Sequence, residues 1–170
     1  MNYKYILLIL CGALVFSCGN DYDLTDYFDL EELPGYVAFN APGNSATLDD
    51  VMSTEDGGTV TFNIECPTGT LTDITVEYTF SGDAVWGTDF NVAGASASGG
   101  SITITARPGD ATNRSNVDID VAILTDGVQD GAKTLSITLI SASNADGSLA
   151  IGRGGTDLLT TATVVIADID

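Results

Sequence analysis

The sequence predicts an all-β protein, a seven-strand antiparallel immunoglobulin-like Greek-key β-sandwich. Two observations support this. From Tyr36 onward, apolar residues recur at every second position in seven short runs, and Gly, Asp, Asn and Ser fill the gaps between the runs. No long stretch after the first 18 residues has a helical period. A period of two is typical of strands that have one face in a core and the other in water.

Each run predicts one strand, and Thr, Ser, Asp, Asn and Glu occupy most of the alternate positions. The apolar residues expected to face the core are, in chain order, Val37 and Phe39; Val60, Phe62, Ile64 and Cys66; Ile74, Val76, Tyr78 and Phe80; Ile102, Ile104 and Ala106; Val117, Ile119, Val121 and Ile123; Leu135, Ile137 and Leu139; and Ala162, Val164 and Ile166.

The first residues read as an export signal. The apolar stretch from Tyr5 to Phe16 is shorter than the about 20 residues that a membrane-spanning helix needs. The following "VFSC" resembles the lipobox of bacterial lipoproteins, which implies cleavage after Ser17 and a lipid on Cys18. The alternative is an ordinary signal peptide with a chance cysteine. The lipobox reading attaches the protein to a membrane through Cys18.

The predicted organisation is a signal peptide over residues 1–17, a lipidated acidic tether over 18–35 and the sandwich domain over 36–170. The tether "GNDYDLTDYFDLEELPG" has acids without a helical or strand period, which is typical of a solvated segment. Its position after the lipid cysteine resembles the surface-export signals of Bacteroidetes lipoproteins. That resemblance implies an outer-membrane lipoprotein exposed at the cell surface.

Composition excludes several functions. The formal net charge of −19 repels the phosphates of nucleic acids. The absence of histidine rules out serine and cysteine nucleophiles that need a histidine base. Export and lipidation leave Cys66 without a partner for a disulfide, and its place in a strand pattern predicts a buried, inert thiol. We therefore predict a protein that is not an enzyme.

Alternating strand directions bring the first, third and fifth connections and the C-terminus to one end of the sandwich. The acids on these segments are Glu55, Asp56, Asp89, Asp126, Asp130, Asp168 and Asp170. Such carboxylates repel one another unless a cation lies between them, and calcium accepts carboxylate oxygens in flexible geometry. Loop acids outside this set, namely Asp83, Asp110, Asp146 and Asp157, favour the other interpretation, ordinary solvated loops. Both interpretations stay open on the residues alone.

The order of motifs resembles the Calx-beta family, whose domains occur in sodium–calcium exchangers and in extracellular bacterial proteins. The similar segments are "STEDGGTVTFNI", "VEYTFSGDAVWGTDF", "GGSITI", "ILTDGVQDGAKTLSITL" and "TATVVIADID". The resemblance implies a calcium site made by Glu55, Asp89, Asp126, Asp130, Asp168 and Asp170, with a backbone carbonyl near Val128.

Four positions depart from the family pattern. Thr125 stands where the family has an Asp, Asp130 is shorter than the usual Glu, Lys133 replaces an acid, and Leu135 replaces an aromatic residue. A lysine near the cage adds positive charge and removes ligand oxygens. We therefore expect a weak calcium site, with a dissociation constant of about 10⁻⁴–10⁻³ M, or none.

Together these inferences predict a non-enzymatic, lipid-anchored surface module that acts in adhesion or protein binding. The alternatives are a metal-free interaction lipoprotein of the same fold and a glycan-binding accessory protein of a surface uptake system. For the latter, Tyr78, Trp86 and Phe90 are the candidate sugar platform, although the same residues suit a core. The first strand is expected to begin at the end of the sandwich opposite to the acids.

Overall fold

The computed structural model describes residues 35–106 and 115–169, which lie within one compact unit, Leu33–Asp170. The predicted signal peptide, the lipidation site Cys18, the tether before Gly35, and Asp110 and Asp170 lie outside the described residues. The described strands are β1 (Tyr36–Phe39), β2 (Val51–Thr54), β3 (Thr59–Cys66), β4 (Ile74–Gly82), β5 (Phe90–Val92), β6 (Gly99–Ile104), β7 (Ser115–Ile123), β8 (Lys133–Asn144), β9 (Gly147–Ile151) and β10 (Thr161–Ala167). Short 3₁₀ turns cover Pro42–Asn44 and Arg153–Gly155.

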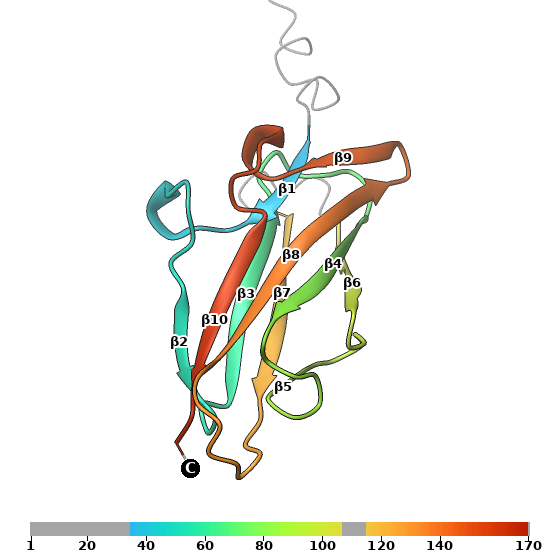
Figure 1. Ribbon diagram of the computed structural model, residues 1–170. Coiled ribbons are helices and arrows are strands. Elements are labelled where there is room, and N and C mark those ends of the chain that lie inside the picture. Colours follow the sequence, from blue (N-terminus) through green and yellow to red (C-terminus); the bar gives the residue numbers. More distant parts are fainter. Residues whose placement is uncertain (1–34, 107–114, 170) are drawn as a thin grey trace, which may run out of the picture. The chain divides into compact units, whose positions relative to one another are not determined.

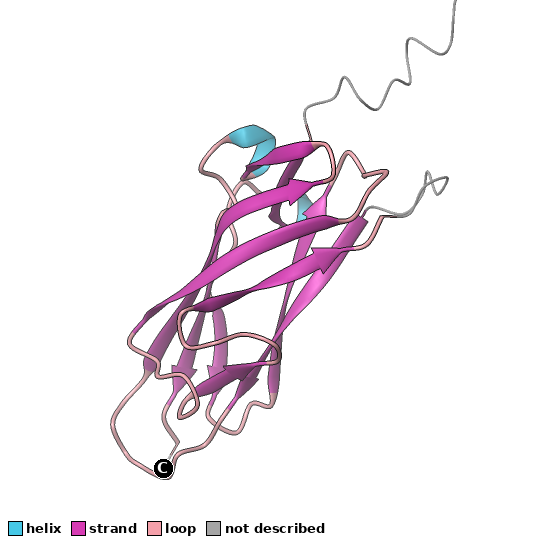
Figure 2. Ribbon diagram, turned by 90° about the vertical axis from the view of Figure 1, so that its right-hand side faces the viewer, coloured by secondary structure: helices cyan, strands magenta, loops and turns pink. Residues whose placement is uncertain are grey.

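The strands form two layers (Figures 1 and 2). One layer has the order β2-β10-β8-β4-β6, and the other has the order β1-β3-β7-β5. Strand β9 joins the layers at one end, because it pairs antiparallel with β8 and parallel with β1. Within the described part of the chain, no helix is long and apolar enough to cross a membrane.

The predicted all-β sandwich is confirmed. The seven predicted strands correspond to β1, β3, β4, β6, β7, β8 and β10. The structure adds β2, β5 and β9, which have only three to five residues each and are too short to show a clear alternation. The seven predicted strands pair antiparallel with one another, as expected. The two parallel pairs, β1–β9 and β2–β10, each involve one of the added strands.

The apolar residues at alternate positions of the predicted strands form the core. On β8, for example, Leu135, Ile137 and Leu139 are at most 3% exposed, while the residues between them reach solvent. Phe80, Ile102 and Val117 are only partly buried, but they pack against the same core. Burying an apolar side chain of this size stabilises the fold by about 1.5–3 kcal/mol relative to leaving it exposed.

Cys66, at the end of β3, is fully buried, as predicted. Its thiol donates to the carbonyl oxygen of Gly69 at 3.3 Å. Burial raises the pKa of the Cys66 thiol, which keeps it in the unreactive protonated form. In the chain from residue 19 onward, which contains no other cysteine, we expect DTNB to react slowly with the native protein and rapidly in urea. Equal rates in the two conditions would show that the thiol is accessible.

Candidate functional site: the acidic pole

Four segments meet at one end of the sandwich, here called the acidic pole: residues 55–58, 83–90, 124–132 and 167–169. Direct hydrogen bonds join them. The hydroxyl of Thr125 donates to the carbonyl oxygen of Glu55 at 2.8 Å, and the amide of Leu124 donates to the carbonyl oxygen of Asp89 at 2.9 Å. The predicted convergence of these connections is therefore confirmed for the described residues. Thr125, a departure from the Calx-beta pattern, ties two of the loops together.

The C-terminal segment joins the same group. The amide of Glu55 donates to the carbonyl oxygen of Ala167 at 3.2 Å, and the amide of Gly131 donates to Oδ2 of Asp168 at 2.7 Å. The parallel pairing of β2 with β10 positions the first contact, because it holds Thr54 opposite Ala167. Asp168 thus holds the 124–132 loop against the end of β10.

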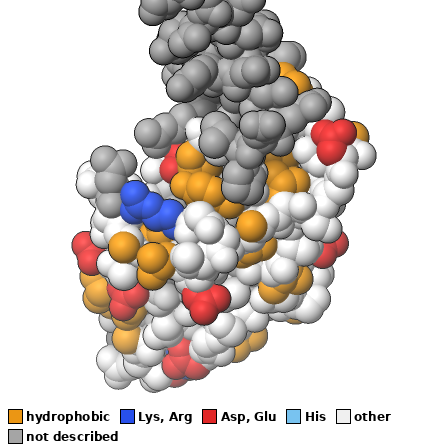
Figure 3. Space-filling model, turned by 90° about the horizontal axis from the view of Figure 1, so that it is seen from above, with side chains coloured by type: hydrophobic (Ala, Val, Ile, Leu, Met, Phe, Trp, Pro, Cys, Tyr) orange, Lys and Arg blue, Asp and Glu red, His pale blue; other side chains and the backbone are white. Residues whose placement is uncertain are grey.

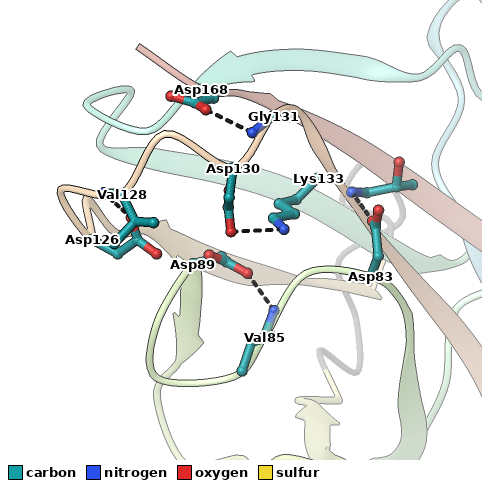
Figure 4. A network of polar contacts seen from close by, with 10 residues as sticks. Asp83, Val85, Asp89, Asp126, Val128, Asp130, Gly131, Lys133 and Asp168 are labelled. Carbon is teal, nitrogen blue, oxygen red and sulfur yellow. Dashed lines mark hydrogen bonds and ion pairs between the residues drawn. The ribbon is translucent and has the colours of Figure 1, made fainter. Parts of the chain in front are cut away.

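Two of the acids, Glu55 and Asp89, are only 2% exposed. Oδ2 of Asp89 accepts a hydrogen bond of 2.5 Å from the amide of Val85, which closes the 85–89 loop (Figure 4). The next residue, Phe90, enters the core and is 1% exposed. A buried carboxylate is costly unless hydrogen bonds or charges compensate it, so the closed loop is part of what holds Asp89 in place.

The other loop acids also bind backbone amides. Oδ1 of Asp126 accepts from the amide of Val128 at 2.8 Å, as in an Asx turn. Asp83 accepts from the amide of Thr134 at 2.5 Å. The expectation that Asp83 lies outside the acid cluster is wrong. Asp83 directly follows β4, which ends at the pole, and this position in the sequence could have predicted its place.

Lys133 contributes a positive charge to the pole. It lies two residues before the buried Leu135 on β8, so its side chain leaves the same face of the strand and extends between the two layers. Its Nζ lies 2.8 Å from Oδ2 of Asp130, and the lysine side chain is 20% exposed. Figure 4 shows the ammonium among Asp130, Asp89 and Asp83.

The hydrogen bond with Asp130 is the main reason that the pKa of Lys133 lies above its usual value. Partial desolvation opposes this shift, and the negative charges of Asp130, Asp89 and Asp83 add to it. The ammonium is therefore fully charged at neutral pH. Lys133 thus places a positive charge beside Asp89 and Asp130, two of the residues that the Calx-beta resemblance implies as calcium ligands.

The predicted ligands among the described residues lie at the same end of the sandwich but are not grouped as a metal cage; they are Glu55, Asp89, Asp126, Asp130 and Asp168. Among residues 35–106 and 115–169, no three or more His, Cys, Asp or Glu side chains are placed to hold a metal ion together. Calcium takes six to eight oxygen ligands, whereas one oxygen each of Asp89, Asp126 and Asp168 accepts from a backbone amide. In the described residues these three carboxylates are therefore held by the backbone of the pole.

The aromatic residues beside the pole pack on one another. The rings of Trp86 and Phe80 are stacked, with centroids 5.6 Å apart, and Trp86 meets Phe90 edge-on at 5.6 Å. Tyr78 is 3% exposed, and its burial raises the pKa of its hydroxyl. Phe90 is buried, while Phe80 and Trp86 are half-buried and pack against the core.

The sequence matches no family model and no curated protein. Among solved structures, the apo-form Calx CBD1 domain aligns with a TM-score of 0.54 and 20% identity, over 80% of this chain and 98% of that one. The Calx CBD2 domain aligns with a TM-score of 0.52 and 16% identity, over 78% and 86%. The calcium binding domain CBD12 of CALX1.1 gives 0.50 and 23%, over 71% of this chain and 42% of that one. This chain therefore has a Calx-beta-like β-sandwich fold.

Proposed function

We propose that this protein is a non-enzymatic binding module, anchored to the outer membrane by a lipid on Cys18, whose acidic pole faces away from the membrane. The position of β1 supports the orientation. Strand β3 begins next to the pole at Thr59 and runs away from it, and β1 pairs antiparallel with the distal half of β3, with Phe39 opposite Ile64. Tyr36, where the tether enters, therefore lies at the end far from the acids (Figure 1).

The surface of the pole supports a binding role. Val85, Val128 and Ile169 are 54%, 54% and 49% exposed, and all three lie on pole segments among carboxylates. Apolar side chains surrounded by polar groups are typical of protein interfaces. The chemistry favours a partner that presents cationic side chains around an apolar centre, because carboxylates attract such a surface and repel acidic ones.

Several features support the absence of catalysis. The chain has no histidine, and glycoside hydrolysis would need two carboxyl groups that face each other across a cleft. A hollow of about 220 Å³ beside Arg153, at the end away from the pole, is lined by only one acid, Glu65. Of the two calcium alternatives, we propose the metal-free module, because Lys133 and backbone amides already engage the pole carboxylates.

Anchoring and display can be tested in the native host. We expect radioactive palmitate to label the wild type and not Cys18→Ala, and we expect the variant to leave the membrane fraction. Protease added to intact cells should remove the wild-type protein while a periplasmic lipoprotein survives as the control. Label on Cys18→Ala would contradict the lipidation site, and protection from protease in intact cells would contradict surface display.

Photo-crosslinking on intact cells can test which end of the domain binds a partner. A photoreactive amino acid replaces Val128 at the pole, or Ser148 on β9 at the other end as the control; both side chains are exposed. We expect a discrete adduct from position 128 and none from position 148. An adduct from position 148 alone, or none from position 128, would overturn the proposal that the pole is the binding end.

A further inference from the structure

The positive charges of the described residues are unevenly placed. Only two side-chain cations, Lys133 and Arg153, occur in residues 35–106 and 115–169. Arg153 donates to the carbonyl oxygen of Ser45 and lines the hollow at the end away from the pole, the face that Figure 3 shows from above. Within the described chain, Lys133 is therefore the only side-chain cation at the acidic pole.

Three carboxylates surround the ammonium of Lys133. Asp89 is 2% exposed, Asp130 lies 2.8 Å from the ammonium, and Asp83 flanks it from the end of β4 (Figure 4). These three carboxylates come from two separate loops, and in the absence of a cation each would raise the free energy of ionising the others.

We propose that the ammonium of Lys133 is the resident cation of the acidic pole and replaces a divalent ion, so that the pole stays folded without calcium. This inference deepens the metal-free part of the proposed function, and it can hold or fail independently of the proposed binding role.

The hydrogen bonds of the pole explain why calcium would compete poorly. A calcium ion would have to displace the ammonium from Asp130. It would also have to share the carboxylates of Asp89 and Asp168 with the amides of Val85 and Gly131, which already bind one oxygen of each. The wild type is therefore expected to be indifferent to calcium.

Thermal melts of Lys133→Met, Asp130→Asn and the double variant show whether Lys133 stabilises only its ion pair with Asp130 or also the other carboxylates of the pole. The chain from residue 19 onward is suitable because it contains the complete compact unit Leu33–Asp170. Lys133→Met keeps the apolar stem but removes the charge, and we expect Tm to fall by several degrees. The same substitution should still lower Tm in the Asp130→Asn background, because Asp89 and Asp83 would remain uncompensated.

A matched control accounts for the change in net charge. Ala145→Asp adds one negative charge in the exposed turn between β8 and β9, away from the pole, and should leave Tm nearly unchanged. In the wild type, millimolar calcium should have the same effect as magnesium at equal ionic strength, and EDTA should have none.

Three results would overturn the proposal. The first is a calcium-specific rise in the wild-type Tm, since a ligand that binds only the folded state must raise it. The second is an unchanged Tm in Lys133→Met. The third is a decrease in Tm caused by Lys133→Met that disappears in the Asp130→Asn background. This would show that Lys133 stabilises only its ion pair with Asp130.

Discussion

Replacing Phe90 with alanine is expected to lower the free energy of unfolding by about 3–5 kcal/mol. The side chain is 1% exposed, and its ring packs edge-on against Phe80, at 5.2 Å, and Trp86, at 5.6 Å. Its removal would leave a cavity and end both aromatic contacts. Trp86, which lies in the 85–89 loop, would thereby lose one of its contacts with the core.

Urea unfolding of the chain from residue 19 onward, followed by tryptophan fluorescence, measures the loss directly, because Trp86 is the only tryptophan. Val85→Ala is the matched control: it lies in the same loop, and its side chain is 54% exposed. That variant should change stability by no more than about 0.5 kcal/mol. Equal losses in the two variants would show that the aromatic packing does not stabilise this end of the core.

Replacing Gly99 with alanine is also expected to be strongly destabilising. Gly99 opens β6 with a φ of +128°, a conformation that residues with a Cβ rarely adopt. An added Cβ would lie 2.1 Å from the carbonyl oxygen of Tyr78 on the paired strand β4. The backbone strain costs about 1–3 kcal/mol, and relieving the overlap costs about 1–3 kcal/mol more.

Gly94→Ala separates these two costs. Gly94 lies in the loop before Gly99 and has a φ of +78°, but an added Cβ would meet no atom within 4 Å. We expect Gly94→Ala to lower the free energy of unfolding only by the strain of its positive φ. Both variants can be compared by urea unfolding, with amide exchange of β4 and β6 to locate the damage. If Gly99→Ala were no less stable than Gly94→Ala, the close approach of β4 and β6 would not constrain this position.

The alternation of apolar residues was enough to predict the fold, because each long strand has one face in the core. The same rule missed β2, where "VMST" leaves Met52 70% exposed, and β5, which has only three residues. Such short edge strands depend on their neighbours for position. Pairing with β10, and not a pattern within β2, determines where β2 lies.

The alternation of strand directions also predicted which loops meet, because it depends only on the order of the strands along the chain. It could not predict where individual carboxylate oxygens point. Asp126 binds the amide two residues after it, and Asp168 binds the amide of Gly131. The sequence marked Lys133 as a charge near the site, but only the structure shows that β8 directs it between the layers, toward Asp89.

The placement of β1 has a mechanical consequence. This strand pairs on one side with β9, through Tyr36 and Val37, and on the other with β3, through Ala38 and Phe39. A pull applied between the chain entering at Tyr36 and a partner held at the opposite end would act along the axis of β1. Its hydrogen bonds to both neighbours would then share the load in shear, and they would not open one after another as in a zipper. The fold is thus suited to carry tension along its length.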